Sequence, residues 1–114
     1  MARVVTYISP QRQLKDVESI LLEEIRGLDI YQLPTSEQRL ITRIKNELVD
    51  SRLYIRDYES SETRQVQLDI ATKLQHVLNH LLKNILKLSE YNILSAVDVA
   101  QISALLSLIM ENTV

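Results

Sequence analysis

The stretch "ATKLQHVLNHLLKNILKL", residues 71–88, decides the fold class of this chain of 114 residues. Its apolar residues recur at intervals of three and four, which is the spacing of one face of an α-helix. Further apolar residues widen this face to about half of the helix circumference. A helix with so broad an apolar face must pack against at least two other helices. The central seam consists of Ala71, Leu74, Leu78, Leu81, Ile85 and Leu88.

The composition favours helices along the whole chain. Only one glycine, Gly27, is present, and tight β-hairpins need glycine for the positive φ angles of their turns. The length suits one domain with one core. We therefore predict an all-α fold, a four-helix bundle that occupies residues 10–114 as a single domain. Residues 1–9, which include the β-branched stretch "RVVTYIS", are predicted to form a short extended N-terminal arm.

The first helix has clear boundary signals. Ser9 can cap its N-terminus, and Pro10 occupies the first helical position, where its missing N–H has no cost. Gly27 is a candidate C-terminal cap, although the apolar stripe could continue the helix to about residue 32. Pro34 disfavours helical geometry in the residue before it, so the helix must end there at the latest.

Similar signals open the next two helices. Thr35 and Gln38 have the spacing of a capping box, which predicts the start of the second helix. A serine-rich break follows, where Ser60 or Ser61 is expected to cap the third helix. The third helix is predicted to cover residues 62–88.

Ser95 and Asp98 together have the spacing that opens the fourth helix, which is predicted to run from Ser95 to about residue 112 and is apolar nearly all round. A four-helix bundle buries only one stripe of each helix, so we predict that the remaining apolar residues contact a partner chain. The partner is expected to be a second copy of the chain or a related helical subunit. The segment is too short and too polar for a membrane span. We assign Leu105, Leu108 and Ile109 to the core, and Val99, Ile102, Leu106 and Met110 to the interface.

The third helix also carries residues that could bind a nucleotide or a metal. Its leucines and Asn84 are similar to the asparagine-bearing helix of histidine-kinase ATP-binding domains. An ATP site is not expected, because a chain with one glycine lacks the glycine-rich loops that hold phosphates. His76 and His80 have a spacing that suits one metal ion, but no third ligand lies nearby and neighbouring lysines would repel a cation. We therefore predict neither a cofactor nor a metal.

Basic residues form stripes on two of the predicted helices. On the third helix, lysines follow the histidines toward the C-terminus, where positive charge favours the helix dipole. Each stripe could be a solvated surface or a docking strip for an anionic partner. The net charge of −2 gives no general argument for nucleic-acid binding. The candidate anion ligands are Lys73, Lys83 and Lys87 on the third helix, and Lys45, Arg52 and Arg56 on the second.

Three stretches resemble the helical A domain of GINS subunits, especially those of archaea. They are "LLEEIRGLDIYQLPTSEQRLITRIKNEL", with its Leu-Pro break, "HVLNHLLKNILKLSEY" and "LSAVDVAQISALL". The chain has lysines where the family usually has arginines, and it has no phenylalanine. The resemblance implies a DNA-replication component that binds paralogous subunits through its helices. It implies no catalytic residue.

These observations lead to one expected function and one alternative. The catalytic inventory is thin, with no cysteine and no carboxylate pair in an apolar stretch. We expect a non-enzymatic assembly or scaffold subunit in the cytoplasm, where a chain without cysteine fits a reducing compartment. The alternative is a small nucleic-acid-binding accessory protein that uses the basic stripes.

Overall fold

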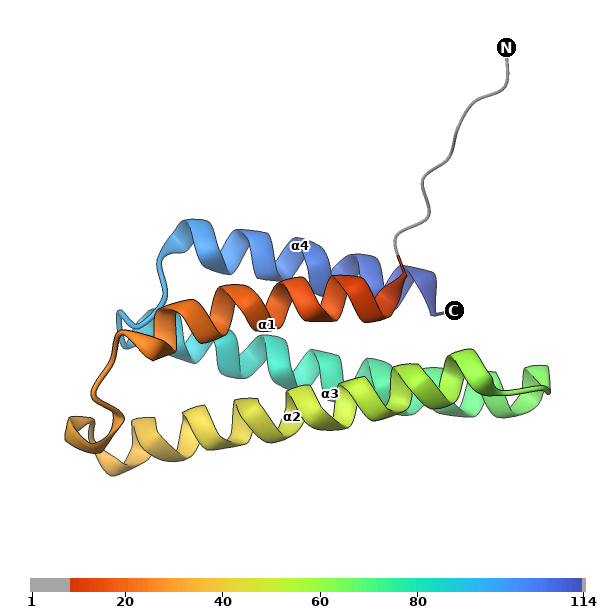
Figure 1. Cartoon of the computed structure of the whole chain (residues 1–114), viewed down its shortest axis with the longest axis horizontal. Coiled ribbons are helices and arrows are strands. Elements are labelled where there is room, and N and C mark those ends of the chain that lie inside the picture. Colours follow the sequence, from red (N-terminus) through yellow and green to blue (C-terminus); the bar gives the residue numbers. More distant parts are fainter. Residues whose placement is uncertain (1–8, 114) are drawn as a thin grey trace, which may run out of the picture.

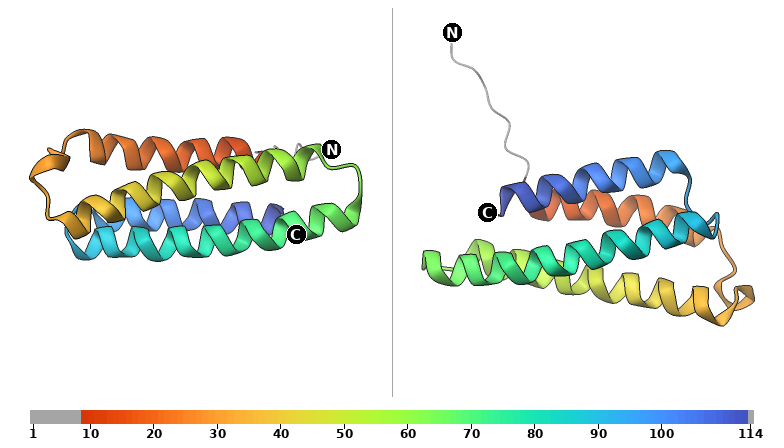
Figure 2. Two further views of the ribbon diagram at one scale, coloured as in Figure 1. Left: turned by 90° about the horizontal axis from the view of Figure 1, so that it is seen from below. Right: turned by 180° about the vertical axis from the view of Figure 1, so that it is seen from behind.

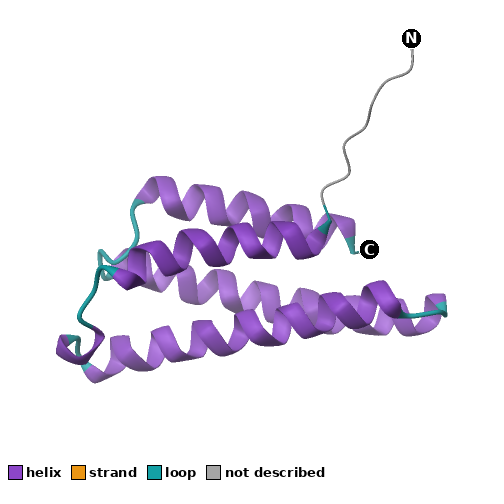
Figure 3. Cartoon of the chain, in the orientation of Figure 1, coloured by secondary structure: helices purple, strands orange, loops and turns teal. Residues whose placement is uncertain are grey.

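The computed structural model describes residues 9–113, so the predicted N-terminal arm lies outside the described residues apart from Ser9. The described residues form four α-helices and one short 3-10 helix, without a strand (Figure 3). This confirms the predicted all-α fold and four-helix bundle. None of these helices is long and apolar enough to cross a membrane. The elements are α1 (Pro10–Arg26), η1 (Ile30–Gln32), α2 (Thr35–Ser60), α3 (Arg64–Glu90) and α4 (Ala96–Asn112).

The four helices form two layers. Each helix packs beside the next one in the chain, and α1 also packs beside α4. Successive helices run in opposite directions, so that α1 and α4 make one layer and α2 and α3 make the other (Figures 1 and 2). Since α2 and α3 have 26 and 27 residues while α1 and α4 have 17 each, the longer pair extends past the shorter pair at the end where α2 connects to α3 (Figure 1).

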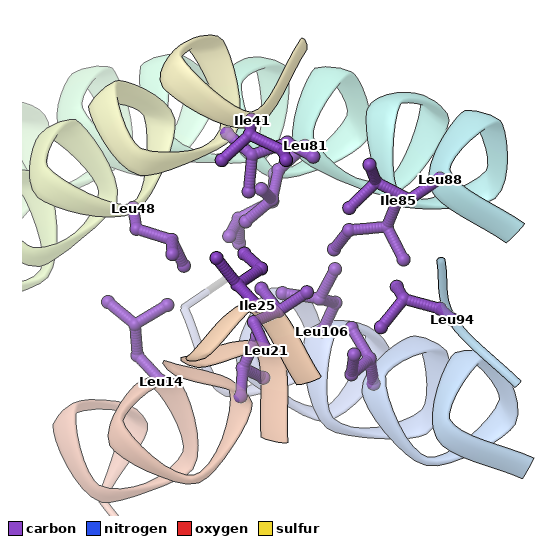
Figure 4. Packing of buried hydrophobic residues seen from close by; sticks show 14 of the residues in the cluster. Leu14, Leu21, Ile25, Ile41, Leu48, Leu81, Ile85, Leu88, Leu94 and Leu106 are labelled. Carbon is purple, nitrogen blue, oxygen red and sulfur yellow. The ribbon is translucent and has the colours of Figure 1, made fainter. Parts of the chain in front are cut away.

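The hydrophobic core lies between the two layers (Figure 4). All six residues of the α3 seam are buried, which confirms the face predicted for this helix. The other three helices each contribute one stripe to the same core, as amphipathic helices of a bundle do. The stripes are Leu14, Val17, Leu21 and Ile25 of α1, Leu40, Ile41, Ile44, Leu48 and Ile55 of α2, and Ile102, Leu106 and Ile109 of α4.

The predicted orientation of α4 is wrong for three residues, whereas Ile109, assigned to the core, is buried and Leu105, also assigned to the core, packs against it. Ile102 and Leu106, which the sequence assigned to a partner interface, are fully buried at 0% exposure, whereas Leu108, assigned to the core, is 43% exposed. Val99 and Met110, also assigned to the interface, are half-buried against the core. The sequence of α4 is apolar or small at nearly every position, so no polar stripe marks its outer side. The inward face is chosen by packing against α1 and α3, which the local pattern does not encode.

The N-terminal caps of α1 and α4 agree with the prediction. The Ser9 hydroxyl accepts a hydrogen bond from the Arg12 N–H at 3.3 Å, with Pro10 at the first helical position. The Ser95 hydroxyl accepts one from the Asp98 N–H at 3.1 Å. Each hydroxyl satisfies an N–H group that the first turn of a helix leaves without a partner.

The other helix ends differ in part from the prediction. Gly27 caps α1 as predicted, but with a right-handed φ of −77° that any residue can adopt. Pro34 takes the N-cap position of α2, so Thr35 is already helical, and the side chain of Gln38 donates to a preceding carbonyl at 2.8 Å instead of completing a capping box. Thr63, rather than the serines before it, caps α3.

The end of α3 is a Schellman motif. The Asn92 N–H donates to the Ser89 carbonyl and the Ile93 N–H donates to the Leu88 carbonyl, each at 3.0 Å. Asn92 has a φ of 60°, and no other non-glycine residue in the described part of the chain has a positive φ. Asparagine reaches this left-handed conformation more easily than other residues with a Cβ atom. Ile93 is buried, so the motif fixes the turn that carries the chain into α4.

Asn92→Gly should raise the free energy of unfolding, because glycine adopts the left-handed conformation without strain. Asn92→Ala should lower the free energy of unfolding by about 1 kcal/mol. Urea unfolding followed by circular dichroism measures both effects. At Gly27 an added Cβ would meet only the Glu24 carbonyl, at 3.8 Å, so Gly27→Ala should instead stabilise by about 0.4–1 kcal/mol. Full stability of Asn92→Ala would contradict the left-handed turn.

Two acidic side chains meet where α1 ends and α4 begins. A hydrogen bond with the Asp98 side chain raises the pKa of Glu24 above its ordinary value of 4.5, and the negative charges of Asp98 and Glu23 add to this rise. Glu24 also lies in the last turn of α1, where negative charge opposes the helix dipole. The folded chain therefore binds a proton at Glu24 more readily than the unfolded chain, and ionisation of Glu24 weakens the native state.

Glu24→Gln should raise the melting temperature at pH 7, because it removes the repulsion from Asp98. Because the pKa of Glu24 is raised in the folded state, stability falls as the pH rises from the pKa of the unfolded state through the pKa of the folded state. The gain from the substitution should therefore shrink in acid and disappear once Glu24 is protonated. Thermal unfolding at several pH values tests this. Glu59→Gln, in the last turn of α2, controls for the position near a helix end, and an equal gain from both variants at every pH would exclude Asp98 as the cause.

Candidate interaction surfaces

The outer side of α4 is exposed and carries no charge between Asp98 and Glu111, which is itself exposed. Every exposed residue between Asp98 and Glu111 is apolar, small or uncharged. Val97 is 66% exposed and Leu108 is 43% exposed. A helix at the surface of a bundle normally carries charged residues opposite its buried stripe, so this surface is unusual. The α4 outer face, as we define it, consists of Val97, Ala100, Gln101, Ala104, Ser107 and Leu108.

Four cationic side chains gather where α2 begins and α3 ends. Arg39 and Arg43 come from α2, and Lys83 and Lys87 come from α3. They line two adjoining depressions of about 230 and 390 Å³ between the helices, and Arg43 and Lys87 line both. None of the four forms an ion pair with another residue of the described chain. We call this surface, with its four cations, the basic groove.

The sequence predicted only half of the basic groove. Lys83 and Lys87 belong to the predicted anion-binding stripe of the third helix, but Arg39 and Arg43 were missed. The stripes were drawn along one helix at a time, whereas the groove is shared by two helices. The short connection between α2 and α3 offered a usable signal, because it requires antiparallel neighbours and so brings the first turns of α2 beside the last turns of α3.

Lys73 and His76 lie outside the basic groove, whereas His80 lines its larger depression. Lys73 lies about 15 Å along α3 from Lys83 by helical rise, in a separate depression of about 280 Å³ that Tyr54 and His76 also line. The rings of His76 and His80 meet edge to face, with their centroids 5.1 Å apart. Within residues 9–113, no three His, Cys, Asp or Glu side chains are grouped to hold a metal ion.

The predicted basic stripe of the second helix faces α1 and not the groove. The Arg52 guanidinium forms an ion pair with Glu18 of α1. Lys45 and Arg56 lie seven residues before and four residues after Arg52, so helical geometry puts them on the same side of α2. The two stripes predicted as anion ligands therefore do not form one surface.

Asn84 has a structural role in the contact between α2 and α3. It is only 5% exposed, and its amide donates a hydrogen bond of 2.6 Å to the Glu47 carboxylate. The buried Ser51 hydroxyl donates to the Glu47 backbone carbonyl at 2.7 Å. A buried amide needs such a partner, because an unpaired one costs on the order of 1–3 kcal/mol. This contact accounts for the asparagine that resembles a nucleotide ligand in sequence.

Asn84→Asp should destabilise the protein by about 1–3 kcal/mol at neutral pH, because it sets a second carboxylate against Glu47. Adding Glu47→Gln should recover most of this loss, since the exchanged pair again joins an amide donor to a carboxylate. Urea unfolding of both single variants and of the double variant gives the coupling energy. Additive losses would contradict a direct bond between the two side chains.

Comparison with known proteins identified no relative of this chain. The chain matches no protein-family model, no curated protein and no solved structure. The α4 outer face and the basic groove are therefore the features from which a function can be inferred.

Proposed function

We propose that the protein is a non-enzymatic assembly subunit that binds a second copy of itself through the α4 outer face. The observation that carries this proposal is that α4 exposes no charge between Asp98 and Glu111, while Val97 and Leu108 are exposed to solvent. An exposed helix face without charge has little to lose in desolvation when it is covered by another protein. Burying one Val or Leu side chain contributes on the order of 1.5–3 kcal/mol before the costs of association.

The spacing on α4 supports a symmetric contact between two copies. Ala100 lies four residues before Ala104, and Leu108 lies four residues after it. If two α4 helices cross antiparallel at Ala104, each Leu108 meets the partner's Ala100, so that a large side chain faces a small one. A two-fold contact of this kind needs only one self-complementary surface, and the antiparallel helix dipoles favour it.

The sequence also led to expectations about the identity of the partner, the biological process and the location. A heteromer with a related helical subunit would use the same face of α4. The GINS-like version, with its role in DNA replication, rests only on the resemblance in sequence and stays a prediction. A cytoplasmic location also stays a prediction, because it rests on the sequence alone. Stable co-purification with a paralogous subunit would be the observation that supports the GINS-like version.

Light scattering at micromolar concentration should give a mass near twice the 13.2 kDa of one chain, decreasing on dilution. The double substitution Val97→Glu and Leu108→Glu should yield a monomer with unchanged helicity, because both side chains lie outside the core and charges at a buried contact are costly. Leu22→Glu is the matched control, since Leu22 is 41% exposed on α1, away from this face. A wild-type chain that stays at 13.2 kDa at all concentrations would rule out the homodimer.

A further inference from the structure

The basic groove combines its cations with an aromatic ring. The smaller depression is bounded by the first two turns of α2 and by the end of α3, where Tyr91 is 46% exposed. Tyr91 thus lies at one end of a line of cations that continues through Arg43 and Lys87 into the larger depression. The smaller depression is lined by Ser36, Arg39, Leu40, Arg43, Lys87 and Tyr91.

The charge in the groove is available to an external ligand. The larger depression also contains Glu47 and Glu90, but one Glu47 oxygen already accepts the hydrogen bond from Asn84. The only ion pair among the described residues joins Arg52 to Glu18, at a different helix contact. The four cations of the groove form no ion pair within the described part of the chain and outnumber the two carboxylates beside them, so an excess of positive charge remains in a protein whose net charge is −2.

The start of α2 strengthens the attraction for anions. Ser36 lies in the first turn of this helix, where unpaired backbone N–H groups and the helix dipole contribute partial positive charge. The arginines add planar donors that can contact two phosphate oxygens at once, and the lysines add mobile point charges. Phosphate is therefore the anion that suits this set of groups.

We propose that the basic groove binds single-stranded nucleic acid, with backbone phosphates at Arg43 and Lys87 and one unpaired base against Tyr91. The aromatic ring distinguishes this ligand from other phosphate carriers. A base in a duplex is stacked on its neighbours and hides its faces, and a phosphorylated peptide presents no base. Only an unpaired base can stack on an exposed tyrosine beside a row of phosphate contacts.

The groove and the α4 outer face lie on opposite layers of the bundle (Figures 1 and 2). Binding at one does not cover the other, so the two proposals can be tested separately. A monomeric protein that binds single strands would refute the proposed assembly alone. A dimeric protein that fails to bind them would refute the groove alone.

The test is fluorescence anisotropy of the full chain with a labelled oligothymidine of about 12 nucleotides, within the usual footprint of single-strand binding sites. Arg43→Ala with Lys87→Ala should weaken binding at least about tenfold at physiological salt. Lys45→Ala with Arg56→Ala is the matched control, because it removes the same charge from the other side of α2. The control pair should change the dissociation constant by less than about twofold.

Tyr91 and salt supply independent readouts. Tyr91→Ala should weaken binding about tenfold while Tyr91→Phe, which keeps the ring, should bind like the wild type. Four phosphate contacts predict a slope of about −3 in a plot of log affinity against log salt concentration, and the Arg43/Lys87 variant should show about half of it. Thermal unfolding of every variant checks that these substitutions of exposed residues leave the fold intact.

Three results would overturn the proposal. The first is no binding of the oligothymidine at micromolar protein. The second is equal loss of affinity in the Arg43/Lys87 variant and in the Lys45/Arg56 control, which would reduce the effect to net charge. The third is tighter binding of the same oligonucleotide as a duplex, or of a phosphorylated peptide in competition, which would assign the groove to a different partner.

Discussion

The broad apolar face of α3 is the constraint on which the rest of the structure depends. Its six-residue seam is fully or almost fully buried, and both neighbours in the chain, α2 and α4, are needed to cover it. Short connections before and after α3 force both neighbours to run antiparallel to it. α1 then closes the bundle by packing between α2 and α4, where a stripe of one helix suffices. The order of the helices around the core thus follows from the width of one apolar face.

The contrast between α3 and α4 explains how far the sequence predicts the fold. In α3 the apolar residues alternate with lysines, histidines and glutamines, so the polar side marks what faces the solvent, and the predicted seam was correct. In α4 no such marker exists, and the prediction turned Leu108 inward and Leu106 outward. The burial of Leu106 results from the position of α1 and α3, which is a property of the assembled bundle. The existence of both helices and the orientation of α3 were therefore predictable, but the orientation of α4 was not.

The candidate sites divide in the same way. Caps depend on residues that are close in the chain, so Ser9 and Ser95 were identified from sequence. The two exceptions are α2, where Pro34 displaced the start by one residue, and α3, where Thr63 is the cap in place of the preceding serines. The basic groove depends on residues more than 40 positions apart, as with Arg43 and Lys87. A stripe drawn on one helix cannot include the cations of its neighbour. Pairing the helices first, from the short connection between them, is the step that would have joined the two sets.

The polar contact between Asn84 and Glu47 lies at the boundary between the hydrophobic core and the basic groove. Asn84 is buried, and Glu47 lines the larger depression of the groove, so their hydrogen bond runs from the interior to the groove. A dimer joined through α4 would carry two such grooves, one between α2 and α3 of each copy. A strand bound in one groove meets the second groove at a raised local concentration only if it is long enough to pass around the dimer. Short strands would bind each groove independently. Only a strand long enough to reach both grooves would bind with an affinity that depends on dimerisation.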